Sequence, residues 1–381
     1  MSLLRPFDVR LRGRVVFGVG AIAQLGGVVA ELGVKRVLVV TDAGLIAAGI
    51  VDRARAALLG AGLDVIVFDM VREEPAEREI DRAAEFARDA KPDALVAVGG
   101  GSSIDTAKGI NFLVGGGGRM RDYRGPATAR GALMPLVAVP TTAGTGSEMQ
   151  SYALIAEDDT HRKMACGDPR AVPRAVILDP ELTVSMPRRV TAAAGVDALV
   201  HGLECAVTKT RSAASLLFAH EAFRLVVHHL ERVLGSPGDV QARGAMLLGA
   251  CWAGQAIEAS MLGAAHAAAN PLSAQHGVVH GHAVGLLAPH VIWRNAEDLG
   301  VRVAYRALAR AADLPQQPGA LADRVAALIA AAGLPTTMAA AGIESPDVAA
   351  LAADAATQWT GKHNPVPMDA AAFEALYRDA R

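Results

Sequence analysis

Short apolar runs alternate with amphipathic segments through the first half of the chain. The apolar runs are rich in β-branched residues and end at glycines or turn residues, as buried strands do. The segments between them carry apolar positions at the helical spacing. We expect strands at residues 35–42, 63–70, 93–101 and 133–142, helices up to about residue 63 and at 80–90, and a strand, a glycine turn and a helix within 12–25. Short strands separated by helices predict a parallel sheet.

The pattern changes after about Pro187. From Arg189 to the end it is rich in Ala, Leu and Val at helical spacing, and Gly and Pro dipeptides interrupt it. We expect helix breaks at residues 235–238, 270–271, 314–315, 334–335 and 364–365. The sequence therefore predicts two domains, an α/β domain at 1–185 and an all-helical domain at 186–381.

Composition narrows the class of protein. Apolar residues make up 52% of the 381 positions, so a large core is expected and disorder is not. A net charge of -2 gives no basic surface for nucleic acid. The three cysteines are far apart and form neither a disulfide framework nor a thiolate zinc site, and we find no signal peptide. These features predict a cytoplasmic protein.

Residues 259–293 contain no Asp, Glu, Lys or Arg, which is one property of a membrane span. They also contain two prolines and five of the eleven histidines, which a lipid-facing helix does not tolerate. We predict a buried, histidine-rich core and no membrane partner. Several buried histidines are costly unless something binds them, so this stretch suggests a metal site.

The sequence GGGSSIDTAK (99–108) follows a predicted strand and opens a predicted helix. Glycines let a phosphate approach the backbone closely, and a helix N-terminus favours an anion. The loop PTTAGTGSE (140–148) offers short hydroxyls that can bond a ribose or an adenine. An ordinary glycine turn and a capping loop are the alternatives. GVGAIA (18–23) matches only part of the dinucleotide fingerprint, because its third glycine is missing.

Asp42 ends a predicted strand, where an acid can bond the ribose hydroxyls of adenosine. An acid there repels a 2′-phosphate, so it favours NAD and disfavours NADP. The alternative role is a helix cap.

Asp197 and His201 stand four residues apart in a helical pattern, which places them on one face, one turn apart. A carboxylate and an imidazole so placed can share an ion, although this spacing also arises by chance. One carboxylate with neutral imidazoles suits Fe²⁺ or Zn²⁺ better than Mg²⁺ or Ca²⁺.

Several long motifs in this order make the chain resemble the iron-containing alcohol dehydrogenase family almost end to end. They are VVTDAGL, GGGSSIDTAKGI, PTTAGTGSE, RKMACGDP, ILDPEL, AAAGVDALVHGLE and HGxxHGxAxGLLxPHV. The resemblance implies a dinucleotide-binding α/β domain, a helical domain and a site in the cleft between them. It also implies hydride transfer between NAD(H) and a small alcohol or aldehyde, Fe²⁺ with Zn²⁺ as the alternative, and a homodimer or larger homo-oligomer.

Aligned on these motifs, the family's metal ligands fall on Asp197, His201, His266 and His280. The expected cofactor-binding residues are Asp42, Gly99, Gly100, Gly101, Ser102, Asp105, Thr141, Thr142, Thr145, Ser147 and Lys163. We expect the substrate pocket to include Met149, Ser151, Trp252 and the segment around His363.

The chain departs from the family pattern at two places. Many members carry a histidine four residues after the third ligand, near the nicotinamide and proposed to help move the proton; here that catalytic position is Asn270, which cannot titrate. His276 is a candidate substitute. A loop that often reads Asn-Pro-Thr is here Glu74-Pro75-Ala76.

Other activities on this fold are less consistent with the residues. Metal-free reductases of the maleylacetate reductase type lack the full ligand set. A zinc-dependent enzyme of the glycerol dehydrogenase type has these ligands but fits the motifs less well. A lyase of the dehydroquinate synthase type needs several basic residues for its substrate, and 259–293 has none. A binding module without catalysis leaves four coincident ligand positions unexplained.

Overall fold

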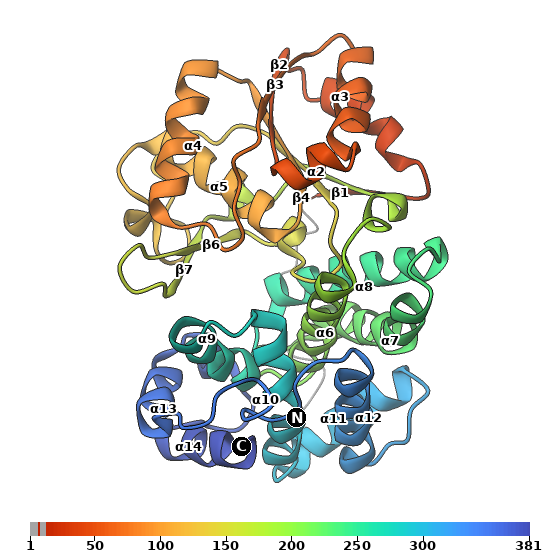
Figure 1. Ribbon diagram of the computed structural model, residues 1–381, viewed down its shortest axis with the longest axis vertical. Coiled ribbons are helices and arrows are strands. Elements are labelled where there is room, and N and C mark those ends of the chain that lie inside the picture. Colours follow the sequence, from red (N-terminus) through yellow and green to blue (C-terminus); the bar gives the residue numbers. More distant parts are fainter. Residues whose placement is uncertain (1–6, 8–12) are drawn as a thin grey trace. The chain divides into compact units, whose positions relative to one another are not determined.

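The computed structural model describes Phe7 and residues 13–381 of the chain (Figure 1). They form two compact units, one ending at Met186 and the other beginning at Pro187. The first is an α/β unit and the second is built from helices.

The α/β unit contains a six-stranded sheet in the order β1-β8-β5-β4-β2-β3, and every neighbouring pair is parallel. This confirms the predicted fold class. The sheet strands are β1 (Arg14–Phe17), β2 (Arg36–Val40), β3 (Asp64–Phe68), β4 (Ala94–Gly99), β5 (Leu136–Pro140) and β8 (Ala175–Leu178). Its helices are η1 (Ala21–Gln24), α1 (Leu25–Ala30), α2 (Ala43–Ala47), α3 (Ile50–Gly60), α4 (Glu77–Ala90), α5 (Gly101–Gly116), η2 (Met120–Tyr123), η3 (Ser147–Met149), η4 (Pro169–Ala171) and η5 (Pro180–Thr183).

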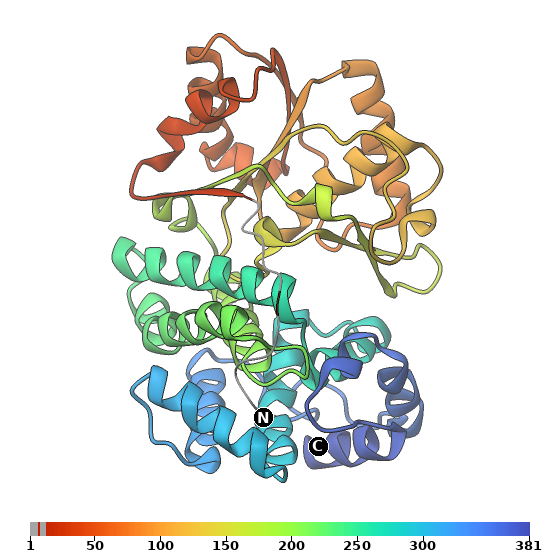
Figure 2. The same ribbon diagram turned by 180° about the vertical axis from the view of Figure 1, so that it is seen from behind.

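Helices cover both faces of the sheet, so alternate strand residues enter two separate cores (Figures 1 and 2). In β2, Val37 and Val39 pack with α1 and α3, whereas Leu38 and Val40 pack with α4 and α5. Strands buried on both faces have continuous apolar sequences, which is why these runs were recognisable.

A two-stranded antiparallel hairpin, β6 (Tyr152–Ala156) with β7 (Lys163–Gly167), was not predicted, and neither was the four-residue strand β8. The hairpin strands read YALIA and KMACG, so they contain a single β-branched residue between them. Ala153 and Ile155 nevertheless pack beside Phe112 of α5 in a third apolar cluster. Tertiary packing, not local propensity, forms this element.

The glycine turn at 18–23 is held by the chain itself. The backbone N–H groups of Gly20 and Ile22 each donate to the buried carboxylate of Asp179 at 3.1 Å. The same carboxylate accepts from the N–H of Glu181 and lies 3.6 Å from the guanidinium of Arg53. The turn therefore uses its amide donors to join β1 to β8, which agrees with its weak match to the fingerprint.

The helical unit consists of α6 (Arg188–Cys205), α7 (Ala213–Gly235), α8 (Val240–Ser260), α9 (Ala264–His276), α10 (His280–Asn295), α11 (Leu299–Ala311), α12 (Pro318–Ala331), α13 (Val348–Thr357), η6 (Thr360–His363) and α14 (Ala370–Asp379). The predicted break at 270–271 is wrong, because Pro271 lies inside α9. One proline removes a single N–H donor, and burial of the residues on either side holds the helix together. The break falls instead at Met261–Gly263, where Met261 has a φ of 68°.

The stretch without acidic or basic side chains covers the end of α8, α9 and most of α10. Within the described residues, no single helix is long and apolar enough to cross a membrane. The helices α8 and α9 satisfy that criterion only when taken together, and they are bent by 106° at the break between them.

Candidate functional site

Three helices of the helical unit bring the four predicted metal ligands together. Asp197 and His201 lie one turn apart on α6, and both are buried. His266 is the third residue of α9, and His280 is the first residue of α10.

The Nε2 atoms of the three histidines surround one oxygen of Asp197. Its Oδ1 lies 3.5 Å from His201, 3.4 Å from His266 and 3.8 Å from His280. The rings of His201 and His266 stack with their centroids 4.7 Å apart, and the ring of His280 lies 5.5 Å from that of His266.

The ligand atoms of Asp197, His201 and His266 all lie within 4.8 Å of one another, close enough to share a divalent metal ion, whereas His280 falls outside this group although its Nε2 lies 3.8 Å from Asp197 Oδ1. Four ligands in a tetrahedron, each about 2.0–2.1 Å from a metal, have donor atoms about 3.3–3.4 Å apart. Asp197 Oδ1 and His266 Nε2 are buried, and neither makes a hydrogen bond within the part of the chain that the structure describes. Buried polar atoms without partners are costly, and a shared cation satisfies both atoms together.

Glu204, one turn beyond His201 on α6, orients the third ligand, a role that the sequence did not suggest. Its carboxylate accepts from His266 Nδ1 at 2.7 Å, which leaves Nε2 as the nitrogen that faces Asp197 and would bind a metal once its own proton is lost. The same carboxylate accepts from the N–H groups of Gly263 and Ala265, the cap and second residue of α9. Glu204 thus fixes both the beginning of α9 and the tautomer of His266.

A second buried side chain supports the same helix end. Asn364 Oδ1 accepts from the N–H of Ala264 at 3.2 Å. Asn364 is held by a pair of hydrogen bonds with Asn295 of α10. A Cβ at Gly263 would lie 2.9 Å from the Glu204 carboxylate, so a glycine is required where α9 begins.

Burial and neighbouring charges act in opposite directions on this cluster. Burial disfavours the ionised form of Asp197, yet His201 and His266 beside it hold its pKa well below the usual range. Burial also disfavours the charged form of His266, but the carboxylates of Asp197 and Glu204 outweigh that effect and raise its pKa to about 9. A metal ion therefore has to displace a proton from His266 at neutral pH.

The remaining histidines of the stretch do not join this cluster. His276 is exposed at the end of α9, while His282 and His290 are half-buried on α10. Only His266 of the five is fully buried, which corrects the expectation of a wholly buried set; His280, His282 and His290 are half-buried and His276 is exposed. Asn270 donates from Nδ2 to Gln358 Oε1 at 3.0 Å.

In the α/β unit, the glycine turn and the threonine loop lie side by side at the carboxyl edge of the sheet. The strands β4 and β5 are neighbours, and the N–H of Thr141 donates to the carbonyl of Gly99 at 3.0 Å. A Cβ at Gly101 would lie 2.8 Å from the side chain of Thr145, and one at Gly100 would lie 3.1 Å from that of Thr142. This close packing leaves no room for a side chain at either position, so both residues have to be glycine. At these two positions a ligand at the start of α5 would meet backbone groups only.

Lys108, which the sequence did not single out, holds the threonine loop (residues 140–148) from the interior of the α/β unit. Its fully buried ammonium donates to the carbonyls of Ser147 and Tyr152, each at 2.7 Å. Asp105, also buried, accepts from the N–H of Leu154 and lies 3.7 Å from that ammonium. Lys108 and Asp105 therefore stabilise the conformation of this loop from the protein interior.

Two other predicted cofactor residues already have partners. Asp42 caps α2, with its Oδ1 accepting from the N–H of Leu45 at 3.0 Å. Asp42 follows β2, which pairs with β4, so it lies one strand away from the glycine turn. The ammonium of Lys163 lies 2.8 Å from the carboxylate of Glu74. The cofactor roles of all these residues stay predictions.

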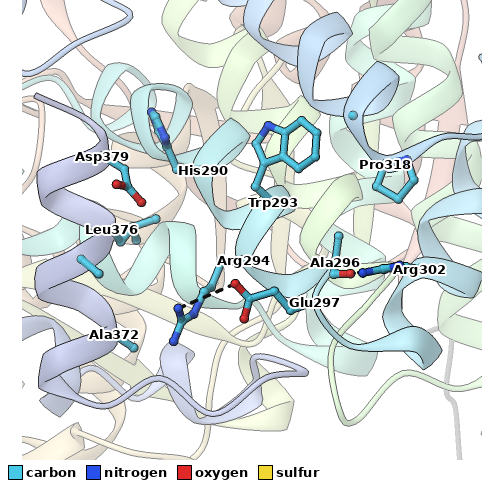
Figure 3. Close-up of a pocket in the computed structure, with 12 residues that line it drawn as sticks. His290, Trp293, Arg294, Ala296, Glu297, Arg302, Pro318, Ala372, Leu376 and Asp379 are labelled. Atoms are coloured by element: carbon cyan, nitrogen blue, oxygen red, sulfur yellow. Dashed lines mark hydrogen bonds and ion pairs between the residues drawn. The ribbon is translucent and has the colours of Figure 1, made fainter.

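A pocket of about 660 Å³ opens in the helical unit at the far end of α10 from His280 (Figure 3). Figure 3 shows His290 and Trp293 of α10 facing it, with Leu376 and Asp379 of α14 on one side. None of the residues expected to form the substrate pocket lines it. The pocket is therefore separate from the metal-ligand cluster.

Comparison with known proteins agrees with this geometry. A family model described as iron-containing alcohol dehydrogenase matches residues 13–180, and one described as Fe-containing alcohol dehydrogenase family, C-terminal, matches residues 191–381. The NAD-dependent methanol dehydrogenase of Bacillus methanolicus is 34% identical over 309 residues, which cover 78% of this chain and 81% of that protein.

Two solved structures are similar over nearly the whole chain. A 1,3-propanediol oxidoreductase has a TM-score of 0.93 at 30% identity, covering 99% of this chain and 100% of that one. A sulfoacetaldehyde reductase from Bifidobacterium kashiwanohense, in complex with NAD+, has a TM-score of 0.90 at 26% identity and covers 99% of each chain.

We expect Glu204→Gln to weaken Zn²⁺ binding about 10- to 100-fold. Glutamine is neutral and offers one acceptor oxygen to the three N–H donors that the carboxylate now satisfies, so the hydrogen bond that orients the His266 ring is weakened. Affinity is measured by competition with a chromophoric chelator, and far-UV circular dichroism checks the fold. Glu221→Gln, which removes an exposed carboxylate paired with Arg224 on α7, is the matched control. Unchanged Zn²⁺ affinity in Glu204→Gln would contradict this role.

Metal uptake should release protons. Because the pKa of His266 is raised to about 9, its ring is protonated below that pH and competes with the metal. We expect Zn²⁺ affinity to rise about tenfold per pH unit between about pH 7 and 8.5, with about one proton released per metal from His266. Calorimetric titrations at pH 7 in buffers of different ionisation enthalpy count the protons. The number of protons released per metal is compared between the wild type and His266→Ala. If the wild type releases no more protons than the variant, the proton does not come from His266.

Proposed function

This chain belongs to the iron-containing alcohol dehydrogenase family, and we propose that it transfers a hydride between NAD(H) and a small primary or secondary alcohol, or the matching aldehyde. The family membership confirms the resemblance drawn from the motifs. The observation that carries the proposed chemistry is the ring of three histidine nitrogens around one oxygen of Asp197, at 3.4–3.8 Å.

Asp197, His201, His266 and His280 would hold the metal, Fe²⁺ with Zn²⁺ as the alternative. A divalent ion held there supplies a Lewis acid for the oxygen of the alcohol or aldehyde. The protein's contribution is preorganisation: Asp197 brings the one negative charge, and Glu204 keeps the His266 lone pair directed at the metal position.

The start of α5 would bind the pyrophosphate of the dinucleotide, whose nicotinamide supplies or accepts the hydride. Gly100 and Gly101 carry no side chain at this helix start, and Thr142 and Thr145 pack directly against them. Lys108 holds the threonine loop in place from the protein interior. Asp42, one strand away, favours the two free ribose hydroxyls of NAD over the 2′-phosphate of NADP.

Asn270 has no role as a proton acceptor in this scheme. Its amide does not titrate and already donates to Gln358. The proton lost when the alcohol is oxidised would therefore leave by a route that does not use Asn270, through water and a hydroxyl that the bound cofactor would supply.

The proposal includes a cytoplasmic location, and the three buried cysteines, which no disulfide joins, support a reducing compartment. The homodimer or larger homo-oligomer expected from the resemblance stays a prediction.

The first test is NADH oxidation with a panel of short aldehydes, using protein stripped by a chelator and then reloaded anaerobically with Fe²⁺ or Zn²⁺. We expect stripping to lower activity at least about 100-fold and one of the two ions to restore it, because the Lewis acid is lost and regained. His280→Ala should not recover on reloading. Full activity without bound metal would refute the proposal and favour a metal-free reductase.

A second test concerns the choice of dinucleotide. Asp42→Ser removes the negative charge but keeps an oxygen that can cap α2 at the N–H of Leu45. We expect the ratio of kcat/KM for NADH over NADPH to fall about tenfold or more, because the 2′-phosphate is no longer repelled. Asp52→Ser, an exposed acid on α3, is the control. An unchanged ratio would exclude Asp42 as the determinant.

A further inference from the structure

An ion pair stands beside the glycine turn of the α/β unit. Lys163 is the first residue of β7, and its ammonium lies 2.8 Å from the Glu74 carboxylate. Glu74 belongs to the loop between β3 and α4 and is half exposed, whereas the lysine side chain is 22% exposed. The Lys163 ammonium is thus already neutralised by the Glu74 carboxylate of the same unit.

The backbone of Glu74 ties this pair to the start of α5. Its N–H donates to Ser102 Oγ at 3.3 Å, and Ser102 is the second residue of that helix. The backbone of Glu74 is therefore next to the start of α5, where partial positive charge attracts an anion, and its side chain pairs with Lys163.

The loop holds Glu74 in a conformation that glutamate seldom adopts. Its φ is 52°, in the left-handed region that residues with a Cβ rarely adopt. The next residue fixes the loop from the other side, because the carbonyl of Pro75 accepts from the N–H of Ala156 in β6 at 2.9 Å. Such strain persists only where the surroundings enforce it, and it gathers at binding sites.

We propose that Glu74 is an affinity-setting residue for the dinucleotide: by pairing with Lys163 beside the glycine turn, it weakens the hold of this turn on the pyrophosphate. This inference rests on the proposed function, which places the pyrophosphate at the start of α5.

The electrostatic argument follows from the charges at the turn. The helix start and Lys163 both attract the pyrophosphate, and Glu74 cancels the charge of the lysine. A bound dinucleotide draws Lys163 away from Glu74. Breaking this ion pair costs affinity, so the acid keeps binding weak and shortens the lifetime of the bound cofactor.

The test compares wild type with E74Q, which keeps the size of the side chain and removes its charge. Binding of NADH and of ADP-ribose to metal-free protein is measured by fluorescence titration and calorimetry, so no turnover is needed. We expect E74Q to bind both about 3- to 10-fold more tightly and to lose affinity more steeply with added salt. ADP-ribose has the pyrophosphate but no nicotinamide, so an equal gain for both ligands locates the effect at the turn.

E73Q is the matched control, since Glu73 is the exposed neighbouring acid in the same loop. It makes the same change in net charge, and we expect its affinities to stay within about twofold of wild type. A gain in E73Q equal to that in E74Q would mean that net charge alone is responsible, and it would overturn the proposal.

A K163M background tests whether the acid acts through the lysine. We expect the gain from E74Q to be smaller there, because no cation remains to be released. An equal gain in both backgrounds overturns the role of the ion pair. Unchanged or weaker binding by E74Q overturns the proposal outright, since the carboxylate would then be inert or a direct contact of the cofactor.

Failure of this inference is distinguishable from failure of the proposed function. If wild type binds neither NADH nor ADP-ribose, the proposed cofactor site is wrong and the inference falls with it. If wild type binds both and E74Q binds no more tightly, only the role of Glu74 is wrong.

Discussion

The buried carboxylate of Glu204 joins the fold of the helical unit to the chemistry of its site. It accepts two backbone N–H groups where α9 begins and the Nδ1 proton of the third ligand, His266. Removing a partner from a buried charged hydrogen bond costs several kcal/mol, roughly 3–5 in measured cases. The position of α9, the tautomer of His266 and the separation of the ligand atoms therefore depend on one side chain, and a change in any of them changes the other two.

The α/β unit uses buried charges in the same way. Lys108 supports the threonine loop through two carbonyls, and Asp179 joins the first glycine turn to the end of β8 through three N–H groups. Each ion satisfies backbone groups that a loop would otherwise leave buried and unpaired. The loops at the carboxyl edge of the sheet are thus fixed before any ligand arrives, which lowers the ordering cost of binding.

The sequence predicted those features that repeat with a regular period. The doubly buried strands, the change to helices near Pro187 and the one-turn spacing of Asp197 and His201 all follow from periods of two or about 3.6 residues. The hairpin β6–β7 and the continuity of α9 through Pro271 depend on packing between distant segments, which no local pattern contains. His266 and His280 came from the family motifs, and Glu204 and Lys108 emerged only once helix ends and loops were placed in space.

The two departures from the family pattern fall where the fold tolerates change. Asn270 is half-buried and makes one side-chain hydrogen bond, and the Glu74 side chain is half exposed. Neither side chain holds a helix end or a strand, whereas Glu204 and Lys108 each satisfy two backbone groups. Substitution of Asn270 or Glu74 can therefore alter proton transfer or cofactor affinity without a large cost in stability. Glu204 and Lys108 are constrained by folding as well as by function. Variation of function within this architecture is expected at such weakly tied side chains, which no helix end or strand depends on.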